Sequence, residues 1–259
     1  MIELRYPISI CITTYESSET LIRTVKDLSS NYSNIEFCIV DNFSTDGTFE
    51  GLKSLKNNNI KIIKLKSTRG EGRNRAVEMA KNDVILIIDA DVYIKNINKY
   101  LEKYISDEYR KVLLLRGDNK GAWAMFITKK LFMNLEGFPD LNTAEDSFFF
   151  KLCSKLNLLR ELKLYNGDVH SIPINGMISG NERRYSHSIF SLLKRNIFRT
   201  RDYIIVGQRY TNFIQNRVRN HESIYVNSVL YIIAYPLAKL KKIDSLDKRM
   251  EIVKDRIEN

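Results

Sequence analysis

The chain has 259 residues, of which 44% are hydrophobic and 28% are charged, and its formal net charge is +10. This composition excludes an intrinsically disordered chain and is typical of a globular protein with a sizeable core. The three cysteines are widely spaced, which excludes a disulfide framework and a zinc-binding cysteine cluster, and the first residues lack the features of a secretory signal. We therefore expect a cytoplasmic α/β domain with an appendage.

The positive charge is concentrated in the second part of the chain. Residues 1–150 hold 21 basic and 21 acidic side chains, whereas residues 151–259 hold 20 and 10. Between residues 183 and 219 there are nine basic side chains and a single acid, Asp202. This density predicts an anionic partner such as a lipid surface, a pyrophosphate or nucleic acid, and a solvated basic face is the alternative.

Five short apolar runs occur in the first part, at residues 8–12, 35–40, 60–65, 84–88 and 112–115. Runs of this length, rich in β-branched residues, are typical of strands buried on both faces of a parallel sheet. Helical patterns alternate with them, which predicts right-handed βαβ units and an open, mostly parallel sheet flanked by helices. Ligands of such sheets bind at the carboxyl ends of the strands, so we expect functional residues directly after each run.

Polar residues follow the first and second runs. Thr13, Tyr15 and Glu16 form a turn whose aromatic ring is able to stack on a nucleobase, and a plain helix-capping turn explains them equally well. Asp41 and Asn42 end the second run, where they are placed to bind the edge of a nucleobase. The residues after them suit the cap of the next helix.

The third and fourth runs lead to charged residues. Residues 68–76 are rich in glycine, which allows close backbone approach, and Arg69 and Arg73 are candidates for binding phosphate at the start of a helix. The fourth run ends in Asp89 and Asp91, whose carboxylates together suit a hard cation such as Mg²⁺ or Mn²⁺. Because the pair directly follows five apolar residues, we prefer this interpretation to a helix cap.

Three more side chains are candidates for the site. Glu145 and Asp146 directly precede an apolar helix, where acids favour the helix N-terminus or where one of them can deprotonate an acceptor hydroxyl. His170 is one of three histidines in the chain. It is either a structural side chain or a third ligand of the metal.

The pattern changes after about residue 178. Residues 188–199 predict a basic amphipathic helix. Residues 224–238 form an apolar run that is shorter than the roughly 20 residues of a spanning helix, so it is a core or subunit-contact helix or an interfacial membrane helix. We therefore divide the chain into a catalytic domain, residues 1–178, and a basic, mainly helical extension, residues 179–259.

Together and in this order, these segments resemble the family 2 glycosyltransferases, which have the GT-A fold. The resemblance rests on ICITTYE, IVDNFSTDGT, RGEGRNRAVEMA, LIIDAD, the block GFPD with ED four residues later, and VH. It extends from residue 8 to residue 170, and the segment after it carries no motif of the family.

The resemblance implies a metal-dependent, inverting transfer of a sugar from a nucleotide diphosphate sugar to a hydroxyl of a glycan or lipid-linked acceptor. It implies that Asp91 binds Mn²⁺ or Mg²⁺, that Asp89 contacts the ribose and the metal, and that His170 is a further metal ligand. By the same resemblance, Asp146 is the catalytic base and Glu145 binds the donor sugar or the acceptor.

The resemblance also implies where the donor lies. The side chains expected to bind the nucleotide sugar follow the first three runs and are Thr13, Tyr15, Glu16, Asp41, Asn42, Arg69 and Arg73. Trp123 falls where the family forms its sugar and acceptor pocket, so it stacks on a sugar face or is a core tryptophan.

Two other functions remain open. A sugar-phosphate nucleotidyltransferase shares the general fold but needs a glycine-rich loop after the first strand, and residues 13–20 contain no glycine. A non-catalytic membrane-binding or nucleic-acid-binding module would depend on the basic extension, yet no nucleic-acid-binding motif is evident, so we expect no nucleic acid partner. The expected partners of the extension are an anionic membrane surface on the cytoplasmic side, or a second copy of the chain bound through the C-terminal helices.

Overall fold

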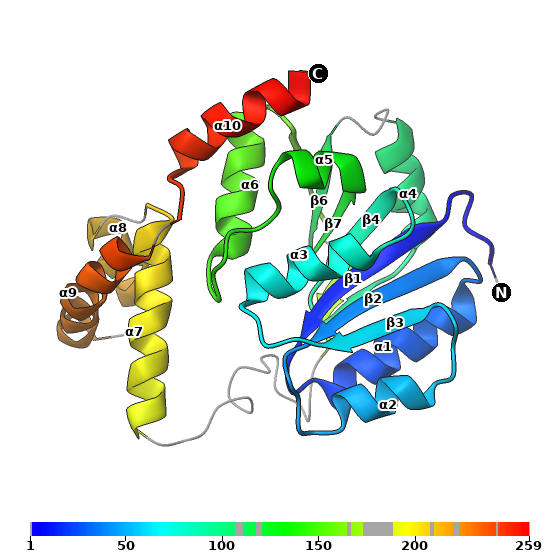
Figure 1. Ribbon diagram of the computed structural model, residues 1–259, viewed down its shortest axis with the longest axis horizontal. Coiled ribbons are helices and arrows are strands. Elements are labelled where there is room, and N and C mark those ends of the chain that lie inside the picture. Colours follow the sequence, from blue (N-terminus) through cyan, green and yellow to red (C-terminus); the bar gives the residue numbers. More distant parts are fainter. Residues whose placement is uncertain are drawn as a thin grey trace.

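A seven-stranded sheet, in the order β3-β2-β1-β4-β7-β6-β8, forms the centre of the computed structural model (Figure 1). The structure describes residues 2–106, 111–117, 121–164, 167–172, 189–207, 210–219, 223–241 and 243–258. The strands of this sheet are β1 (Ile8–Thr14), β2 (Ile35–Asp41), β3 (Ile60–Lys64), β4 (Val84–Ile88), β6 (Val112–Arg116), β7 (Trp123–Thr128) and β8 (Leu159–Lys163). A separate antiparallel pair consists of β5 (Val92–Ile94) and β9 (Val169–Ser171).

The five predicted strands are confirmed, and the sheet is mostly parallel as expected. β1 pairs in parallel with both β2 and β4, so the carboxyl ends of these strands meet at one edge. The sequence did not reveal β7, which lies antiparallel between β4 and β6. In the sheet, β7 separates the first four strands from β6 and β8. This order is not visible in the sequence, because it depends on pairing between distant segments.

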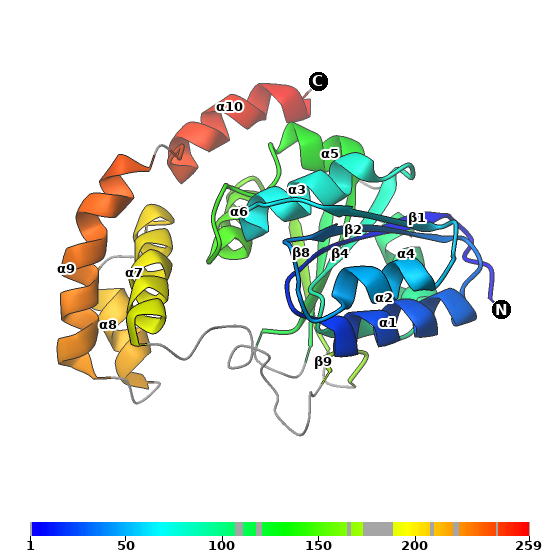
Figure 2. The same cartoon turned by 60° about the horizontal axis from the view of Figure 1, so that its bottom comes forward.

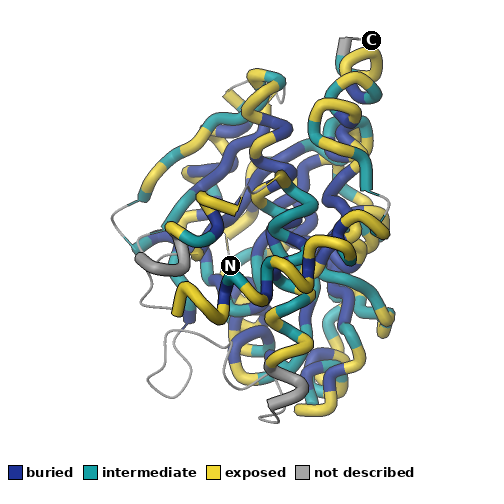
Figure 3. Tube along the Cα trace, turned by 90° about the vertical axis from the view of Figure 1, so that its left-hand side faces the viewer, coloured by how far each residue is buried: buried dark blue, intermediate teal, exposed yellow. Residues whose placement is uncertain are grey.

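Helices cover both faces of the sheet. One face carries α1 (Ser18–Asn31), α2 (Thr48–Ser54) and α4 (Ile97–Ser106), and the other carries α3 (Arg69–Met79), α5 (Lys129–Asn134) and α6 (Glu145–Lys155), as Figure 2 shows. Successive strand side chains alternate between two apolar cores, for example Ile10 and Ile12 toward α1 and Cys11 toward α3. Figure 3 shows that the buried residues are concentrated in the strands. Burial on both faces is the reason why the strands are continuous apolar runs.

The C-terminal extension is helical, as predicted. It consists of α7 (Ile189–Ile205), α8 (Tyr210–Arg219), α9 (Ile224–Leu240) and α10 (Leu246–Glu258). The first three form a group beside the sheet domain, and α10 returns over α5 and α6 (Figures 1 and 2). The predicted boundary at residues 178 and 179 lies outside the described residues. Among the helices in the described ranges, none combines the length and the apolar character needed to cross a bilayer.

Helix α10 attaches the extension to the sheet domain. The buried Arg249 guanidinium donates hydrogen bonds to the carbonyl oxygens of Leu135, Glu136 and Gly137, which follow the end of α5. Carbonyl groups at the C-cap of a helix and directly after it have no partner within the helix, and Arg249 satisfies three of them here. The extension is therefore integrated into the fold rather than tethered to it.

Candidate active site

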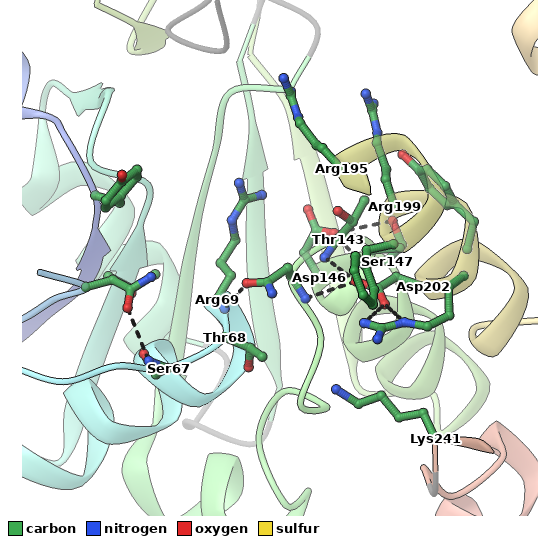
Figure 4. Close-up of a pocket in the computed structure, with 18 of the residues that line it drawn as sticks. Ser67, Thr68, Arg69, Thr143, Asp146, Ser147, Arg195, Arg199, Asp202 and Lys241 are labelled. Carbon is green, nitrogen blue, oxygen red and sulfur yellow. Dashed lines mark hydrogen bonds and ion pairs between the residues drawn. The ribbon is translucent and has the colours of Figure 1, made fainter. Parts of the chain in front are cut away.

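A pocket of about 890 Å³ lies between the carboxyl ends of β1 and β2 on one side and α7 on the other (Figure 4). Five of the predicted site residues line it, and they are Thr13, Tyr15, Asn42, Arg69 and Asp146. The structure thus brings together, at the edge where parallel strands end, side chains that are far apart in the sequence. Such an edge is the usual ligand site of an open α/β sheet.

Glu16 and Asp41 organise the loops behind this pocket instead of lining it. The Asp41 carboxylate is buried and accepts hydrogen bonds from the Ser44 N–H at 3.0 Å and the Ser44 hydroxyl at 2.5 Å. The Ser44 hydroxyl oxygen accepts from the Glu16 N–H at 2.8 Å, and Glu16 Oε1 accepts from the Thr45 N–H at 2.7 Å. The Asp41 carboxylate is thus buried among loop donors, and its expected contact with a nucleobase stays a prediction.

Asn42 and Tyr15 remain at the pocket surface. Asn42 Oδ1 accepts from the Ser67 N–H at 3.2 Å, which joins the end of β2 to the segment before α3. Phe43, which we did not single out from the sequence, is 54% exposed at a φ of 58° and lines an adjoining cavity with Tyr15. A positive φ is unfavourable for a bulky residue and is found at functional sites when the surroundings impose it. The sequence signal that could have identified Phe43 is its position as an aromatic residue directly after Asp41 and Asn42.

The glycines of α3 serve packing. A Cβ atom at Gly70 would lie 1.9 Å from the carbonyl oxygen of Pro139, and one at Gly72 would lie 2.3 Å from Thr13 Oγ1. The two glycines are therefore explained by packing within the protein, and the expected approach of a phosphate to this backbone stays a prediction. Close packing of α3 against β1 and residues 137–141 aligns the arginines that follow.

Arg73 is the centre of a buried charge cluster. Its side chain is 1% exposed, its Nη2 donates to Asp89 Oδ1 at 2.5 Å, and its Nη1 donates to Glu145 Oε1. The guanidinium carbon lies 4.9 Å from the Trp123 ring centroid and 5.2 Å from that of Phe138. This bridge links the end of β4 to the start of α6, and the expected contact of Arg73 with the base or the phosphates stays a prediction.

The charges of this cluster perturb one another. Burial raises the pKa of Glu145, and the positive charges of Arg73 and Arg69 oppose that rise. Burial disfavours the charged form of Arg73, but the carboxylates of Asp89, Glu145 and Asp146 raise its pKa further above the usual arginine value, so it stays charged. Strongly perturbed titratable groups in a cleft are typical of functional sites.

Trp123 belongs to the core. Its side chain is 2% exposed, and its ring meets Phe150 edge to face with the centroids 5.2 Å apart. Of the two interpretations made from the sequence, the core tryptophan agrees with this position, and stacking on a sugar does not. The ring supports the apolar face of the Arg73 guanidinium instead.

The predicted metal ligands follow β4 and lie on β9. Asp89 and Asp91 are half-buried, and the Asp91 carbonyl accepts from the Ile172 N–H at 2.7 Å, which brings the end of β9 alongside. His170 pairs with Tyr93 across β5 and β9, with ring centroids 5.8 Å apart. Within the described ranges, no three or more histidine, cysteine, aspartate or glutamate side chains gather as a metal site. His170 is therefore not brought together with the two aspartates as a ligand set.

The two aspartates nevertheless fit a hard cation by their chemistry. Mg²⁺ is commonly held by one or two carboxylates together with substrate phosphates, rather than by a complete cage of protein ligands. Asp89 and Asp91 supply carboxylate oxygens, and Arg73 already holds Asp89 on one side. A cation here would be bound by the carboxylates of Asp91 and Asp89.

The start of α6 presents Asp146 to the pocket. Ala144 precedes the helix with a φ of 63°, a left-handed conformation that is strained for alanine. Asp146 Oδ1 accepts from the Ser147 N–H at 2.6 Å, and its side chain lines the pocket while Glu145 faces the core. The two adjacent acids therefore have different surroundings, because successive helix positions point in different directions.

Asp202 of α7 holds the segment before α6 in place. Its buried carboxylate accepts from the N–H groups of Asn142 and Thr143, each at 3.1 Å, and pairs with Arg201 at 2.6 Å. Burial raises the pKa of Asp202, and Arg201 opposes the rise. We did not assign Asp202 to the site from the sequence, although its position as the single acid in a basic segment was the signal.

Solved structures share this fold. The chain is 17% identical to *S. aureus* TarS residues 1–349 in complex with UDP-GlcNAc, with a TM-score of 0.54 and coverage of 97% of this chain and 82% of that chain. It is 16% identical to the mannosyltransferase PcManGT from *Pyrobaculum calidifontis* in complex with GDP-Man and Mn²⁺, with a TM-score of 0.54 and coverage of 92% and 77%. The fold is that of the GT-A glycosyltransferases.

The sequence model described as glycosyl transferase family 2 matches residues 9–142, and the chain belongs to this family. It is 37% identical over 89 residues to the *Escherichia coli* UDP-Glc:alpha-D-GlcNAc-diphosphoundecaprenol beta-1,3-glucosyltransferase WfaP. It is 25% identical over 170 residues to the poly(ribitol-phosphate) beta-N-acetylglucosaminyltransferase TarS of *Staphylococcus aureus*. The matches cover 33% and 62% of this chain and 36% and 29% of the relatives, so each spans roughly a third of the relative's length.

Proposed function

We propose that this protein transfers a sugar from a nucleotide diphosphate sugar to a hydroxyl group of a glycan or lipid-linked acceptor. The observation that carries the proposal is the position of Asp146, which lines the pocket between the loops after β1 and β2 and the basic face of α7. Membership of the family supports a glycosyltransferase over a nucleotidyltransferase. The relatives named above act on a diphosphoundecaprenol-linked sugar and on poly(ribitol-phosphate), which supports an acceptor of this general kind.

In this proposal Asp146 is the general base. Its carboxylate takes the proton of the acceptor hydroxyl while the hydroxyl oxygen attacks the anomeric carbon, and the bond from that carbon to the diphosphate breaks. Attack from the face opposite the leaving group inverts the configuration in one displacement, so one carboxylate suffices. Arg69, which is partly exposed at the pocket, is placed to stabilise the negative charge of the departing diphosphate.

We further propose that Asp91 and Asp89 hold Mg²⁺ or Mn²⁺ when donor is bound. Such a cation supplies positive charge beside the diphosphate. Arg73 keeps the Asp89 carboxylate in a fixed position through its hydrogen bond. The expected result of Asp91→Ala is loss of the effect of Mn²⁺ on the melting temperature in the presence of nucleoside diphosphate, and an unchanged effect would contradict the ligand role.

A panel of nucleotide sugars tests the proposed activity. We expect one donor to raise the melting temperature in the presence of Mn²⁺, because a ligand that binds only the folded state stabilises it. The same donor should be hydrolysed slowly, and faster transfer should follow when an acceptor is added. Absence of both binding and hydrolysis across UDP- and GDP-sugars would overturn the assignment.

We also propose that the extension contacts an anionic membrane on its cytoplasmic side. The outer face of α9 is apolar although it is exposed, with Tyr225 at 86% and Ile232 at 70%, and the exposed Lys239 lies in its last turn. Basic residues near an anionic surface each contribute about 1 kcal/mol to binding. Cosedimentation with anionic vesicles at low salt should show binding that high salt reverses. A salt-insensitive dimer without vesicle binding would instead favour a second copy of the chain on this face.

A further inference from the structure

The α7 side of the pocket is strongly basic. Among the described side chains that line the pocket, six are basic and two are acidic, and they are Arg69, Lys194, Arg195, Arg199, Arg201, Lys241, Asp146 and Asp202. Three of the basic groups have a carboxylate partner. Arg201 pairs with Asp202 at 2.6 Å, Lys241 with Asp140 at 3.1 Å, and Arg69 with Glu145 at 3.9 Å. The remaining excess of positive charge lies mainly on α7.

Lys194 and Arg199 are the basic groups of α7 that lack such neutralisation. In the part of the chain that the structure describes, neither has a carboxylate partner, and Arg199 instead lies 5.9 Å from the ring centroid of Tyr203. Arg195 lines the pocket beside them. A lysine and an arginine that line a pocket without carboxylate partners, as Lys194 and Arg199 do within the described residues, favour the binding of an anion.

These cations lie on the far side of Asp146 from the sheet. Figure 4 shows Arg195 and Arg199 on α7, Ser67 and Arg69 on the opposite side, and Asp146 between them. The sheet side is lined by neutral polar groups such as Asn42, together with Arg69. A base must lie beside the acceptor hydroxyl, so the space beyond Asp146 is the acceptor side if the donor occupies the sheet side.

We propose that Lys194, Arg195 and Arg199 form a subsite for a phosphate group of the acceptor, next to the hydroxyl that Asp146 deprotonates. This inference rests on the proposed function. The phosphate belongs either to a polyol phosphate or to the diphosphate of a lipid carrier, and both present the same charged oxygens to the guanidinium and ammonium groups. The subsite orients the acceptor and selects phosphorylated acceptors over neutral ones.

The test measures binding of a phosphorylated probe to protein that is already saturated with nucleoside diphosphate. UDP or GDP, whichever binds more tightly, is added with Mg²⁺, and ribitol 5-phosphate, farnesyl diphosphate and neutral ribitol are then titrated by calorimetry. We expect at least one phosphorylated probe to bind and ribitol not to bind. Preference for ribitol 5-phosphate identifies a polyol phosphate as the source, and preference for farnesyl diphosphate identifies a lipid carrier.

Variants then assign the binding to α7. The double variant Lys194→Ala/Arg199→Ala should weaken binding of the phosphorylated probe about tenfold or more, because it removes charge-assisted hydrogen bonds. Its affinity for the nucleoside diphosphate should stay within about twofold, since the donor lies on the sheet side. The matched control Lys254→Ala/Arg75→Ala removes two exposed basic side chains away from the pocket and should change neither affinity.

Three results would overturn the inference. The first is that neither phosphorylated probe binds the nucleotide-saturated protein. The second is that the control variant loses as much affinity for the probe as the α7 variant does. The third is that the α7 variant loses affinity for the nucleoside diphosphate in parallel, which would assign the cations to the donor. Failure of the proposed function has a different signature, because then neither UDP nor GDP binds the unmodified protein and no nucleotide sugar is hydrolysed. In that case the subsite has no acceptor to bind and the inference fails with it.

Discussion

Two buried glutamates lie at opposite ends of the central sheet, Glu36 at the amino end of β2 and Glu145 beside the carboxyl end of β4. Glu36 is surrounded by donors. It accepts from the Ser9 hydroxyl at 2.5 Å and the Lys81 N–H at 2.9 Å, and it pairs with Lys61 at 2.8 Å. Burial alone would raise the pKa of Glu36, but these donors lower it below the usual glutamate value.

Glu145 has the opposite surroundings. Glu145 and Asp89 share one buried guanidinium, that of Arg73. The Oε2 atom of Glu145 has no hydrogen-bond partner within the described residues. Its pKa is raised by burial. The difference shows how the two ends of one sheet are used: donors outnumber carboxylates where the network only stabilises the fold, and carboxylates outnumber donors where chemistry is expected.

The largest expected effect distinguishes the role of Asp146 from that of its neighbour Glu145. Asp146→Asn should lower the rate of sugar transfer by about 10²–10⁴-fold, because the amide keeps the shape of the side chain and removes the proposed base. Donor affinity, measured by calorimetry, should be retained. Asp83→Asn, at an exposed position before β4, is the control and should leave transfer unchanged. Normal transfer by Asp146→Asn would assign this acid to the helix N-terminus alone.

The next prediction concerns removal of the Arg73 cation from the carboxylate-rich end of the sheet. Arg73→Met should lower the free energy of unfolding by about 3–5 kcal/mol, since it leaves Asp89 and Glu145 without their buried partner. Urea denaturation measures the change. Arg73→Lys should recover only part of it, because an ammonium group cannot bridge two carboxylates as a guanidinium does.

Arg75→Met is the matched control for this variant. Arg75 lies two positions further along α3, is exposed, and pairs with Glu78. Its replacement should change the free energy of unfolding by less than about 0.5 kcal/mol. If both variants were equally stable, the Arg73 bridge would not hold the end of β4 to the start of α6.

A smaller effect is expected for the link between this end of the sheet and α7. Asp202→Asn should lower the free energy of unfolding by about 1–3 kcal/mol, because an amide is a poorer acceptor for the N–H groups of Asn142 and Thr143. Denaturation followed by circular dichroism measures it. Asp247→Asn removes an exposed ion pair with Lys155 and serves as the control. Equal losses in the two variants would contradict a specific role of Asp202.

The smallest expected effect concerns Glu36 and depends on pH. Because the pKa of Glu36 is lowered in the folded state, its carboxylate stabilises the fold above the ordinary glutamate pKa of about 4.3, and this stabilisation is lost as the pH falls through the lower folded-state pKa. Glu36→Gln should therefore cost about 1 kcal/mol at neutral pH and progressively less in acid. Urea titrations at several pH values measure this. A difference that stays constant down to acid pH would contradict the ionised role of Glu36.

The sequence alone predicted five of the strands and the end of the sheet at which the pocket lies. Strands β1 to β4 and β6 are continuous apolar runs, and this property is local, so it is visible without a structure. Of the polar residues directly after these runs, Thr13, Tyr15 and Asn42 line the pocket, and their contact with a donor stays a prediction. The family motifs are also visible in the sequence alone, because each of them consists of neighbouring residues.

Only the tertiary structure decided which charged groups meet. Arg73 is 72 positions from Glu145 and 16 from Asp89, and no local pattern predicts that its guanidinium is buried between them. The same is true of Asp202, which lies 60 positions from Asn142. A buried charge depends on every segment that packs around it, whereas a strand or a helix start depends on a few consecutive residues. For this reason the sequence by itself determined the order of elements and the identity of the candidate acids, and the packing of α3, α6 and α7 decided which of them face the pocket.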